Sequence, residues 1–323
     1  MNLKFFQKAF PTPKFLNIPY VGLAISDDYI RCVKFFRNNG KLSVEFFLEK
    51  PVPGGAIDSG VIKNSVEVSN ILGEIKKEAK FDFARVSIIE EKAYLFNTKV
   101  PKVDSKDIRE AIEFKMEENV PVPSSELIFD YEISTPHGHE DHIDVVVSAF
   151  PTSIVDSYVE TINRAGINVL SLEIESQSVV RSLLPNTPYG AYLVVHLNKQ
   201  KAGLYVAWAG KVHFTSTIIL KGDSVEDLHP LVSEIKRLYI YWHTLRENAE
   251  DKNKKINQII LCGDGANEEV VSFLASHTNS SVSMGNVWQN AFDINEKVPP
   301  IPYQESLSFV AAIGLALPEE DLI

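Results

Sequence analysis

Residues 21–35 read VGLAISDDYIRCVKF, and this stretch decides the fold. An apolar run leads into the polar turn Ser26-Asp27-Asp28, and a second run rich in β-branched and aromatic residues follows, which is typical of a β-hairpin. The hairpin is part of a longer unit, residues 20–49, and residues 191–220 repeat its order of strand, polar turn, strand, Gly-Lys turn and strand. The repeat predicts two halves, each opening with a three-stranded meander.

Each meander is followed by a helix and by one more strand. Apolar residues recur with helical spacing in residues 65–80 and again in residues 224–247, so each segment is expected to bury one face. Further strands are expected at residues 85–90 and 255–262. The order of meander, helix and strand in both halves predicts a two-lobed α/β protein with mixed sheets.

A distinct block lies between these elements, at residues 92–166. Its expected order is a strand, a helix that Asp104 caps, two further strands, and a helix that ends at Gly166. The run Val120-Pro121-Val122-Pro123 ends the first of these helices, because proline cannot continue a helix. The block is therefore predicted to be a small α+β subdomain inserted within the first half. The predicted division of the chain is an N-terminal extension at 1–19, a first lobe at 20–91, the inserted subdomain at 92–166 and a second lobe at 167–323.

Composition and charge exclude several classes of protein. The net charge of −11 argues against nonspecific binding to nucleic acid. No run of about 20 apolar residues occurs, so no helix is expected to span a membrane. Cys32 and Cys262, both in expected strands, are interpreted as buried thiols in a reducing compartment, which makes the cytoplasm the expected location.

The first 20 residues combine lysines with interleaved apolar residues and contain no acid. They lack a small-residue cleavage site, so they are not interpreted as a secretory signal. Contact with an anionic membrane surface or a partner is one interpretation. We favour the other, a terminal segment whose aromatic side chains dock on the domain, because each lysine contributes only about 1 kcal/mol near a charged surface.

Three further stretches resemble a known family. They are PGGAIDSGVI at residues 53–62, a block with EAIEF, VPVP and DY at residues 110–131, and FVAAIGLAL at residues 309–317. In order they resemble the PilM family of actin-like proteins of type IV pilus assembly. The resemblance implies a two-lobed actin/Hsp70-like, ribonuclease H-type fold, with the inserted SHS2-type (1C) subdomain that is also seen in FtsA. It also implies a closing helix at residues 305–317 and a trimmed second lobe, because the segment between Leu220 and Gly263 is short.

The nucleotide site of that fold is altered here. Catalytically active ATPases of this fold carry Asp-x-Gly in each of two phosphate-binding hairpins. The positions of the two aspartates align with Ala24 and His196 in this sequence. The resemblance also assigns a glutamate that could orient an attacking water, and this residue is Glu175. The residues that it places around a vestigial nucleotide pocket are Ser26, Asp27, Asn198, Lys199, Gly263, Asp264 and Gly265.

These departures weaken the expected chemistry. Ala24 cannot hold Mg²⁺, directly or through water, so no cofactor is expected, although ATP binding is left open. Glu175 is interpreted as a polar residue at a strand-to-helix junction, since a general base needs a bound substrate. Asp27 is interpreted as part of a solvated hairpin tip, and Asp264 as a charge that repels a nucleotide. Lys199 and Lys201 are interpreted as solvated rather than as phosphate ligands.

The strongest metal-like cluster is His137-Gly138-His139-Glu140-Asp141-His142. Metal sites need fixed geometry and outer hydrogen bonds, which a loop between two strands offers poorly, so no metal is expected there. No arrangement of nucleophile, histidine and acid with recognisable spacing occurs either.

The resemblance leaves three alternatives for function. The favoured one is a cytoplasmic scaffold or adaptor, peripheral to the inner membrane, which binds the N-terminal tail of a PilN-like membrane protein and does not hydrolyse ATP. Other platform and motor proteins are further expected partners, self-association is left open, and no nucleic acid is expected. The second alternative is an ATP-binding ATPase of pilus assembly, and the third is an FtsA-like, membrane-tethered filament. The short acidic run at residues 318–323 argues against the third, because such a tether needs an amphipathic helix.

Overall fold

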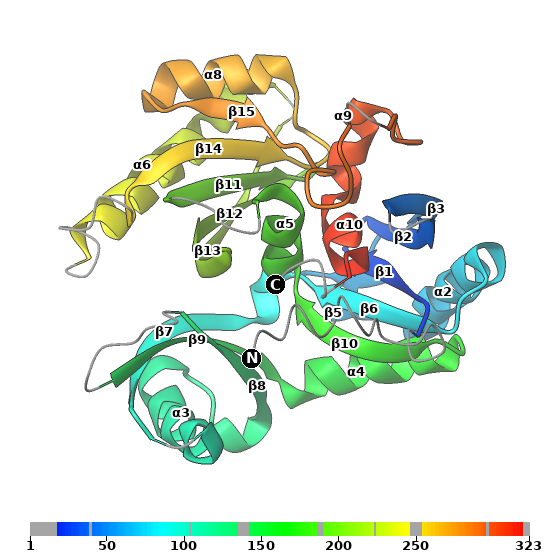
Figure 1. Ribbon diagram of the computed structural model, residues 1–323, viewed down its shortest axis with the longest axis horizontal. Helices are drawn as coiled ribbons and strands as arrows, with labels where there is room; N and C mark the ends of the chain where they lie inside the picture. Colours follow the sequence, from blue (N-terminus) through cyan, green and yellow to red (C-terminus); the bar gives the residue numbers. More distant parts are fainter. Residues whose placement is uncertain are drawn as a thin grey trace.

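Two five-stranded mixed sheets form the two halves of the protein (Figure 1). The computed structural model describes residues 18–38, 41–103, 105–134, 142–185, 190–222, 224–245, 254–294 and 297–318. The first sheet has the order β10-β6-β1-β2-β3, in which β1 to β3 form an antiparallel meander and β6 and β10 run parallel to β1. Its strands are β1 (Tyr20–Ile25), β2 (Tyr29–Asn38), β3 (Lys41–Pro51), β6 (Phe83–Ile88) and β10 (Asn168–Ile174).

The second sheet repeats this arrangement with the order β13-β12-β11-β14-β15. Its meander is again antiparallel, and β14 and β15 are parallel to β11. The strands are β11 (Ala191–Leu197), β12 (Lys201–Trp208), β13 (Lys211–Ile219), β14 (Ile256–Cys262) and β15 (Val282–Met284). The prediction of two lobes, each with a meander and a mixed sheet, is therefore confirmed.

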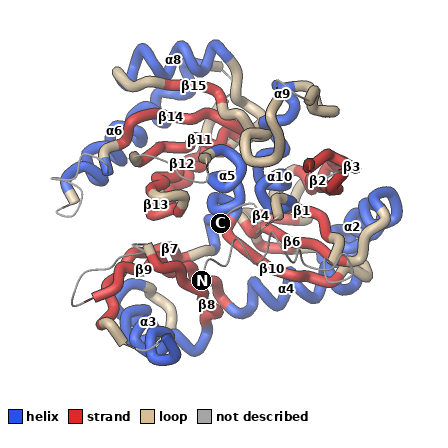
Figure 2. Tube along the Cα trace, in the orientation of Figure 1, coloured by secondary structure: helices blue, strands red, loops and turns tan. Residues whose placement is uncertain are grey.

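Helices cover the outer face of each sheet, as the tube view in Figure 2 shows. In the first half, α2 (Ser65–Ala79) begins at Asn64, whose side chain accepts a hydrogen bond from the Glu67 amide, and it buries the apolar face predicted from its spacing. In the second half, the short turn η4 (Val225–Leu228) leads into α6 (His229–Thr244), which packs beside α8 (Glu268–Thr278). Among the described residues, no helix is long and apolar enough to cross a membrane.

Two helices lie between the halves and join them (Figure 1). They are α5 (Glu175–Leu183) and α10 (Val310–Ala316), which is preceded by α9 (Tyr303–Ser306) and η6 (Leu307–Phe309). They pack so closely that a Cβ atom on Gly314 would lie 1.8 Å from the carbonyl oxygen of Ser178. The predicted closing helix thus fills the junction where α5 meets the first sheet.

A third, smaller sheet with the order β7-β9-β8 stands beside the first half. Its strands are β7 (Tyr94–Pro101), β8 (Leu127–Ile133) and β9 (His142–Pro151), and α3 (Ser105–Asn119) packs on it. Short elements lie nearby: β4 (Ile57–Asp58), β5 (Val61–Ile62), η2 (Glu90–Lys92) and η3 (Ser124–Glu126). The small sheet has its own apolar core, which agrees with an inserted α+β unit; the predicted helix cap, Asp104, lies outside the described residues.

The limits of this unit differ from the predicted boundary between residues 166 and 167. Helix α4 (Thr152–Arg164) packs on the first half, where the buried Tyr158 hydroxyl donates a hydrogen bond to the Gly60 carbonyl at 3.1 Å. The next strand, β10, is the edge of the first sheet rather than the start of the second lobe. Helix α4 carries the chain back to the first sheet, where β10 pairs in parallel with β6. This connection explains why both α4 and β10 belong to the first half.

Candidate functional site

The two β-hairpins predicted to hold phosphate face each other across a cleft between the halves. A pocket of about 110 Å³ lies there, between the β1–β2 turn and the β11–β12 turn, with the end of β6 and the start of α5 as its base. The sequence-predicted residues that line it are Ser26, Asp27, Glu175, Asn198 and Asp264. The lining residues that sequence reasoning did not single out include Tyr29, Glu90, Glu91 and Tyr205.

The turn of the first hairpin is closed by hydrogen bonds between its own residues. Ser26 exchanges hydrogen bonds with Tyr29: the Ser26 hydroxyl donates to the Tyr29 carbonyl at 2.9 Å and accepts from the Tyr29 amide at 3.2 Å. Ala24, where a metal-binding acid would stand, is buried among apolar side chains. This hairpin therefore presents no metal-binding carboxylate, and its Ser26 hydroxyl is already hydrogen-bonded within the turn.

Asp27 is not a solvated hairpin tip, which corrects the interpretation from sequence. Its carboxylate accepts hydrogen bonds from the amides of Ser59 (3.1 Å) and Gly60 (3.0 Å), and it forms an ion pair with Lys201 at 2.7 Å. Ser59 and Gly60 both have positive φ angles, of 49° and 75°, which turn their amides toward the carboxylate. Asp27 thus fixes the residue 53–62 run against the hairpin.

The lysines of the second hairpin reach across to the first half, and Lys201 differs from expectation, whereas Lys199 is exposed as predicted. Lys201, predicted to be solvated, pairs with Glu91 at 2.6 Å as well as with Asp27, and only 27% of its side chain is exposed. Lys199 donates a hydrogen bond to the Tyr29 hydroxyl at 2.6 Å, and its ammonium lies 4.8 Å from the centre of the Tyr29 ring. Both cations are therefore already bound by groups of the first half.

Arg31, which the sequence did not single out, links the two halves at the other side of the cleft. Its guanidinium is largely buried, with Nε 2.6 Å from a Glu49 oxygen and Nη2 2.7 Å from an Asp264 oxygen. Asp264, interpreted from sequence as a charge that repels a nucleotide, is thus ion-paired with Arg31, which it shares with Glu49. An arginine in a strand whose neighbours in sequence are buried and apolar was the signal that could have revealed it.

A group of four titratable side chains closes the base of the cleft: Glu90, Glu175, His196 and Tyr205. The Glu175 carboxylate lies 3.6 Å from His196 Nδ1, and the Tyr205 hydroxyl lies 3.3 Å from both His196 Nδ1 and a Glu90 oxygen. The amide of Ser176, in the first turn of α5, donates to Glu90. The group joins α5 and the first half to β11 and β12.

Burial disfavours the charged forms of Glu90, Glu175 and His196. It raises the pKa of Glu90 to about 7 and raises the pKa of Glu175 well above its usual value, and repulsion between the two carboxylates adds to the shift at Glu175. Burial lowers the pKa of His196 to about 4, so its imidazole is neutral at neutral pH. The raised pKa of Glu175 disfavours its ionised form, and the lowered pKa of His196 means that the imidazole beside it adds no positive charge to offset this.

The adenosine side of the predicted pocket is more open. A cavity of about 450 Å³ lies beyond Asp264, and Asn198, Lys199 and Gly265 line it. Gly263 has a φ of 94°, and a Cβ atom there would lie 2.1 Å from the Leu197 carbonyl oxygen, so this position requires glycine. The predicted residues are therefore divided between a tight, ion-paired cleft and a roomier neighbouring cavity.

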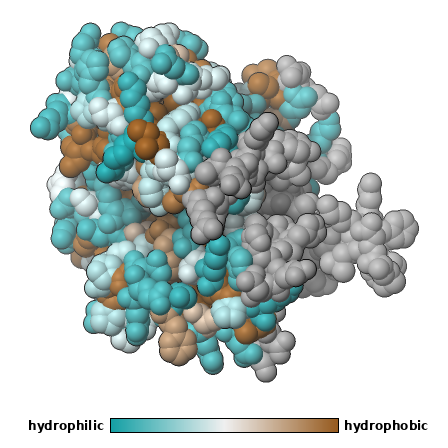
Figure 3. All heavy atoms as spheres, turned by 90° about the vertical axis from the view of Figure 1, so that its left-hand side faces the viewer, coloured by the Kyte–Doolittle hydropathy of each residue, from teal (hydrophilic) through white to brown (hydrophobic). Residues whose placement is uncertain are grey.

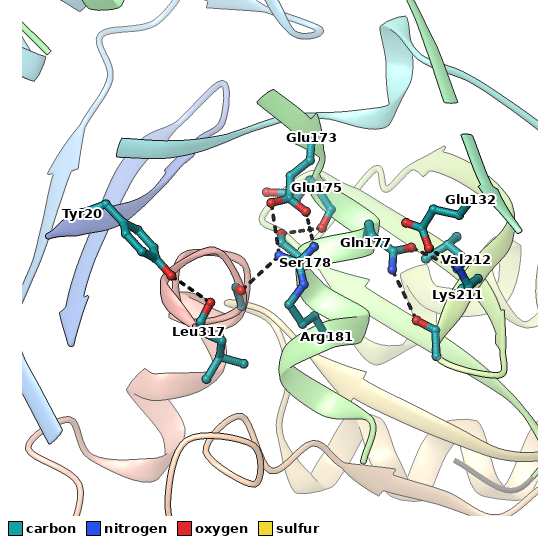
Figure 4. A network of polar contacts seen from close by, with 12 residues as sticks. Tyr20, Glu132, Glu173, Glu175, Gln177, Ser178, Arg181, Lys211, Val212 and Leu317 are labelled. Carbon is teal, nitrogen blue, oxygen red and sulfur yellow. Dashed lines mark hydrogen bonds and ion pairs between the residues drawn. The ribbon is translucent and has the colours of Figure 1, made fainter. Parts of the chain in front are cut away.

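A separate groove of about 320 Å³ runs between the small sheet and the first sheet. Its walls are β8 and β10, which are edge strands of their sheets, and α5 contributes Gln177 and Arg181. Arg181 pairs with Glu173 of β10 at 2.5 Å and donates to the Gly314 carbonyl at 3.2 Å, while Lys211 of β13 pairs with Glu132 of β8 (Figure 4). The same helix α5 thus supplies Glu175 to the cleft and these residues to the groove.

The described residues contain no group of three or more histidine, cysteine, aspartate or glutamate side chains that could hold a metal ion. Residues 137–141 of the histidine-rich cluster lie outside the described part of the chain. His142, its last residue, lies in β9 with Nε2 3.6 Å from an Asp144 oxygen.

Comparison with known proteins identifies what this chain is similar to. The family model described as type IV pilus assembly protein PilM matches residues 22–227. The solved structure of a PilM-PilN type IV pilus biogenesis complex is similar with a TM-score of 0.78 and 17% identity, covering 95% of this chain and 99% of that chain. A search of curated protein sequences finds no match.

More distant solved structures include the ethanolamine utilization protein EutJ from Carboxydothermus hydrogenoformans. It has a TM-score of 0.49 and 12% identity, covering 95% of this chain and 91% of that chain. The cytoplasmic domain of EpsL, from the type II secretion system of Vibrio cholerae, has a TM-score of 0.48 and 10% identity, covering 85% of this chain and 99% of that chain.

Proposed function

The chain belongs to the family of the type IV pilus assembly protein PilM, and on that premise we propose that it is an adaptor of the pilus-assembly platform that does not hydrolyse ATP. It binds the N-terminal tail of a PilN-like inner-membrane protein. It lies at the cytoplasmic side of the inner membrane, held there through its partners.

One observation supports the proposal most strongly: ion pairs between the two halves occupy the place where phosphates and metal would bind. Lys201 of the second hairpin pairs with Asp27 of the first, and Arg31 of the first half pairs with Asp264 of the second. ATP bound between the hairpins would have to break or displace both pairs. The Arg31 side chain is only 8% exposed, so breaking its pair with Asp264 leaves an uncompensated buried charge, which costs about 3–5 kcal/mol.

The metal site is also missing its ligands. Mg²⁺ is bound by carboxylates and phosphates, and the two positions that would supply carboxylates hold the apolar Ala24 and the buried His196. With no ion to neutralise the phosphoryl group, transfer lacks both charge stabilisation and positioning. The cleft pocket of about 110 Å³ is moreover smaller than the roughly 300–1,000 Å³ of usual ligand pockets.

The groove between β8 and β10 suits an extended peptide. Both walls are sheet edges, where a peptide can pair by backbone hydrogen bonds and place alternate side chains into apolar pockets. Its apolar lining includes Ile128, Leu172 and Val212, and Ile128 is 45% exposed. A PilM-PilN complex is among the similar structures, which supports a PilN-like partner.

ATP binding without turnover is the second candidate. The cavity of about 450 Å³ beside Asp264 could accept the adenosine part of a nucleotide. It is not favoured for catalysis, because the groups that act on the phosphates lie in the cleft.

Titration of a fluorescent synthetic peptide tests the proposal. The peptide copies the cytoplasmic tail of the PilN-like protein of the same organism, and the full-length protein is added to it. We expect saturable binding that does not depend on Mg-ATP, and no binding at high micromolar protein would overturn the adaptor function.

A further inference from the structure

The hairpin of β12 and β13 reaches both sites, with one end in the cleft and the other at the groove between β8 and β10, here called the peptide groove. The turn that joins the two strands is Ala209-Gly210, whose positive φ angles of 52° and 75° are those of a tight type I′ turn. β12 is paired with β11 on one side and with β13 on the other. It has eight residues and is therefore roughly 26 Å long, so one element of the second sheet links the two sites.

At the cleft end, Lys201 holds the hairpin to the first half. Its ammonium lies 2.7 Å from an Asp27 oxygen and 2.6 Å from a Glu91 oxygen. Lys201 begins β12 and is paired in the sheet with Ile219, so it lies at the end of the hairpin away from the turn. Thr217 of β13 lines the cleft with it. The two ion pairs therefore fix this end of the hairpin relative to the first half.

At the other end, the turn of the hairpin contributes to the wall of the peptide groove. Gln177 of α5 holds the turn: its side-chain amide donates to the Gly210 carbonyl at 3.3 Å, and its side-chain oxygen accepts from the Val212 amide at 3.1 Å (Figure 4). Lys211 pairs with Glu132 of β8. Gln177, Glu132, Lys211 and Val212 all line the groove. The groove is thus formed by three parts of the molecule: the small sheet, the first half, and a hairpin of the second half.

Hydrogen bonds also hold the hairpin between its two ends. Asn97 of β7 contacts His213 of β13 twice: the two side chains are 2.7 Å apart, and the Asn97 amide donates to the His213 carbonyl at 2.7 Å. On β12, the Tyr205 hydroxyl donates to Glu90 at 3.3 Å. The hairpin is therefore braced against the first half and the small sheet along its length, and a displacement at one end is carried to the other.

We propose that Lys201 is a positioning residue for the peptide groove: its ion pairs in the cleft hold the β12–β13 hairpin so that the turn completes the wall around the tail. Lys201 lines the cleft, whereas Lys211 lines the groove, so Lys201 acts through the hairpin. Loss of the ammonium leaves two carboxylates that approached the same nitrogen, and their repulsion favours a wider cleft. This inference rests on the proposed function, because it needs the tail to bind between β8 and β10.

Affinity for the tail peptide tests this positioning. We expect Lys201→Ala to weaken tail binding about fivefold in fluorescence anisotropy, and Lys201→Arg, which keeps the charge, to restore most of the loss. The matched control is Arg237→Ala, which removes an ion pair of 2.6 Å that lies within α6. This variant should bind the tail as the native chain does.

A double-mutant cycle distinguishes positioning from a general loss of stability. Lys211→Ala frees the turn from Glu132 and is expected to weaken tail binding by itself. If Lys201 acts through the turn, adding Lys201→Ala to this variant causes little further loss. Additive losses overturn the proposal, and so does a loss in Lys201→Ala that Lys201→Arg does not restore.

A distance between two spin labels tests the hold on the hairpin without the tail. The labels are attached to Phe114→Cys on α3 and Ile240→Cys on α6, whose native side chains are 78% and 66% exposed. Both helices lie at the left of Figure 1, and on the side of the molecule that Figure 3 shows the hydrophobic atoms form separate patches. The native Cys32 and Cys262 are buried, so they are protected from labelling.

The distance distribution separates this inference from the proposed function. We expect a narrow distribution in the native chain and a broader one in Lys201→Ala, and an unchanged distribution overturns the positioning. If the distribution broadens but the tail binds none of these proteins, the adaptor function fails, while the hold of Lys201 on the hairpin stands. If the tail binds the native chain and Lys201→Ala equally, the adaptor function stands and the positioning fails.

Discussion

The cleft between the halves and the groove beside the small sheet share helix α5 but have opposite character. In the cleft, Arg31, Lys199 and Lys201 reach groups of the opposite half through ion pairs or hydrogen bonds of 2.6–2.7 Å, and the space left is about 110 Å³. In the groove, apolar side chains remain exposed, two sheet edges face each other, and the space is about 320 Å³. The cleft is filled by the protein's own side chains, whereas the groove leaves room for a partner.

Under the proposed function, this difference is how a nucleotide-binding fold gives up hydrolysis while it keeps its architecture. Cross-lobe contacts that a nucleotide and its metal would mediate are made directly by side chains, so the halves stay joined. Because Glu175 begins α5 and Arg181 lies near its end, the same helix fixes both sites. On this account the cleft is structural and the groove is functional.

The largest expected effect comes from opening the cleft. Arg31→Ala removes the guanidinium that neutralises Glu49 and Asp264, and it should lower the free energy of unfolding by about 3–5 kcal/mol. Lys34→Ala is the matched control, because Lys34 lies on the same strand and pairs with the exposed Glu45 of the same sheet, so its loss should cost about 1 kcal/mol or less. Urea denaturation measures both, and equal losses would remove the distinction between cross-lobe and surface pairs.

The sequence predicted the helices and strands around the two sites better than the side-chain contacts between them. Alternating and helical spacings, turn residues and prolines located the two meanders, α2, α6 and the small sheet within a few residues. The cross-lobe pairs could not be read in the same way, because Lys201 and Asp27 are 174 positions apart and only the folded sheets bring them together. Asp27 and Lys201 were therefore interpreted as solvated, although both are held.

Glu90 and Glu91 were overlooked for a different reason. They follow β6, which runs parallel to β1, and the carboxyl ends of parallel strands meet at one edge of a sheet. That rule placed them beside the first hairpin and could have been applied to the sequence. The position of β10 was missed because a strand after a helix can return to either sheet, and only packing decides which.

The second prediction concerns pH and the base of the cleft. Burial raises the pKa of Glu90 from 4.5 to about 7, so between these values the folded state binds more protons than the unfolded state, and through this group stability falls as pH rises. Buried His196 acts in the opposite direction between about pH 4 and pH 6.5, because its pKa is lowered. Glu90→Gln removes only the first effect.

Glu90→Gln should therefore gain about 2 kcal/mol in unfolding free energy, relative to the native chain, between about pH 5 and about pH 7.5. Glutamine keeps an oxygen that can accept from the Ser176 amide, so the local hydrogen bond is preserved. Denaturant midpoints at the two pH values measure the change. Identical pH dependence in both proteins would show that Glu90 titrates normally and that the cleft is wetter than described.

A third prediction tests the groove itself. Ile128→Asp places a charge on the exposed apolar lining of β8 and should weaken binding of the tail peptide about tenfold, or about 1.4 kcal/mol. Ile240→Asp, on α6, should leave the affinity unchanged. Fluorescence anisotropy gives both values, and a loss at residue 240 but not at residue 128 would place the peptide elsewhere.

The smallest effect separates the two lysines of the second hairpin. Lys201→Ala removes two partly buried ion pairs and should lower the free energy of unfolding by about 1 kcal/mol, whereas Lys199→Ala removes one exposed hydrogen bond and should lower it less. Thermal unfolding of the two variants in parallel measures this order. The reverse order would mean that Tyr29 and Lys199, rather than Asp27 and Lys201, hold the hairpins together.

Phosphate release from Mg-ATP by the full-length protein, with and without saturating tail peptide, tests the central claim most directly. The account predicts release at the level of the buffer alone, unchanged by the peptide and the same for Glu175→Ala. The claim would be contradicted by release above that level which Glu175→Ala abolishes, because the buried carboxylate at the start of α5 would then be acting on a bound nucleotide.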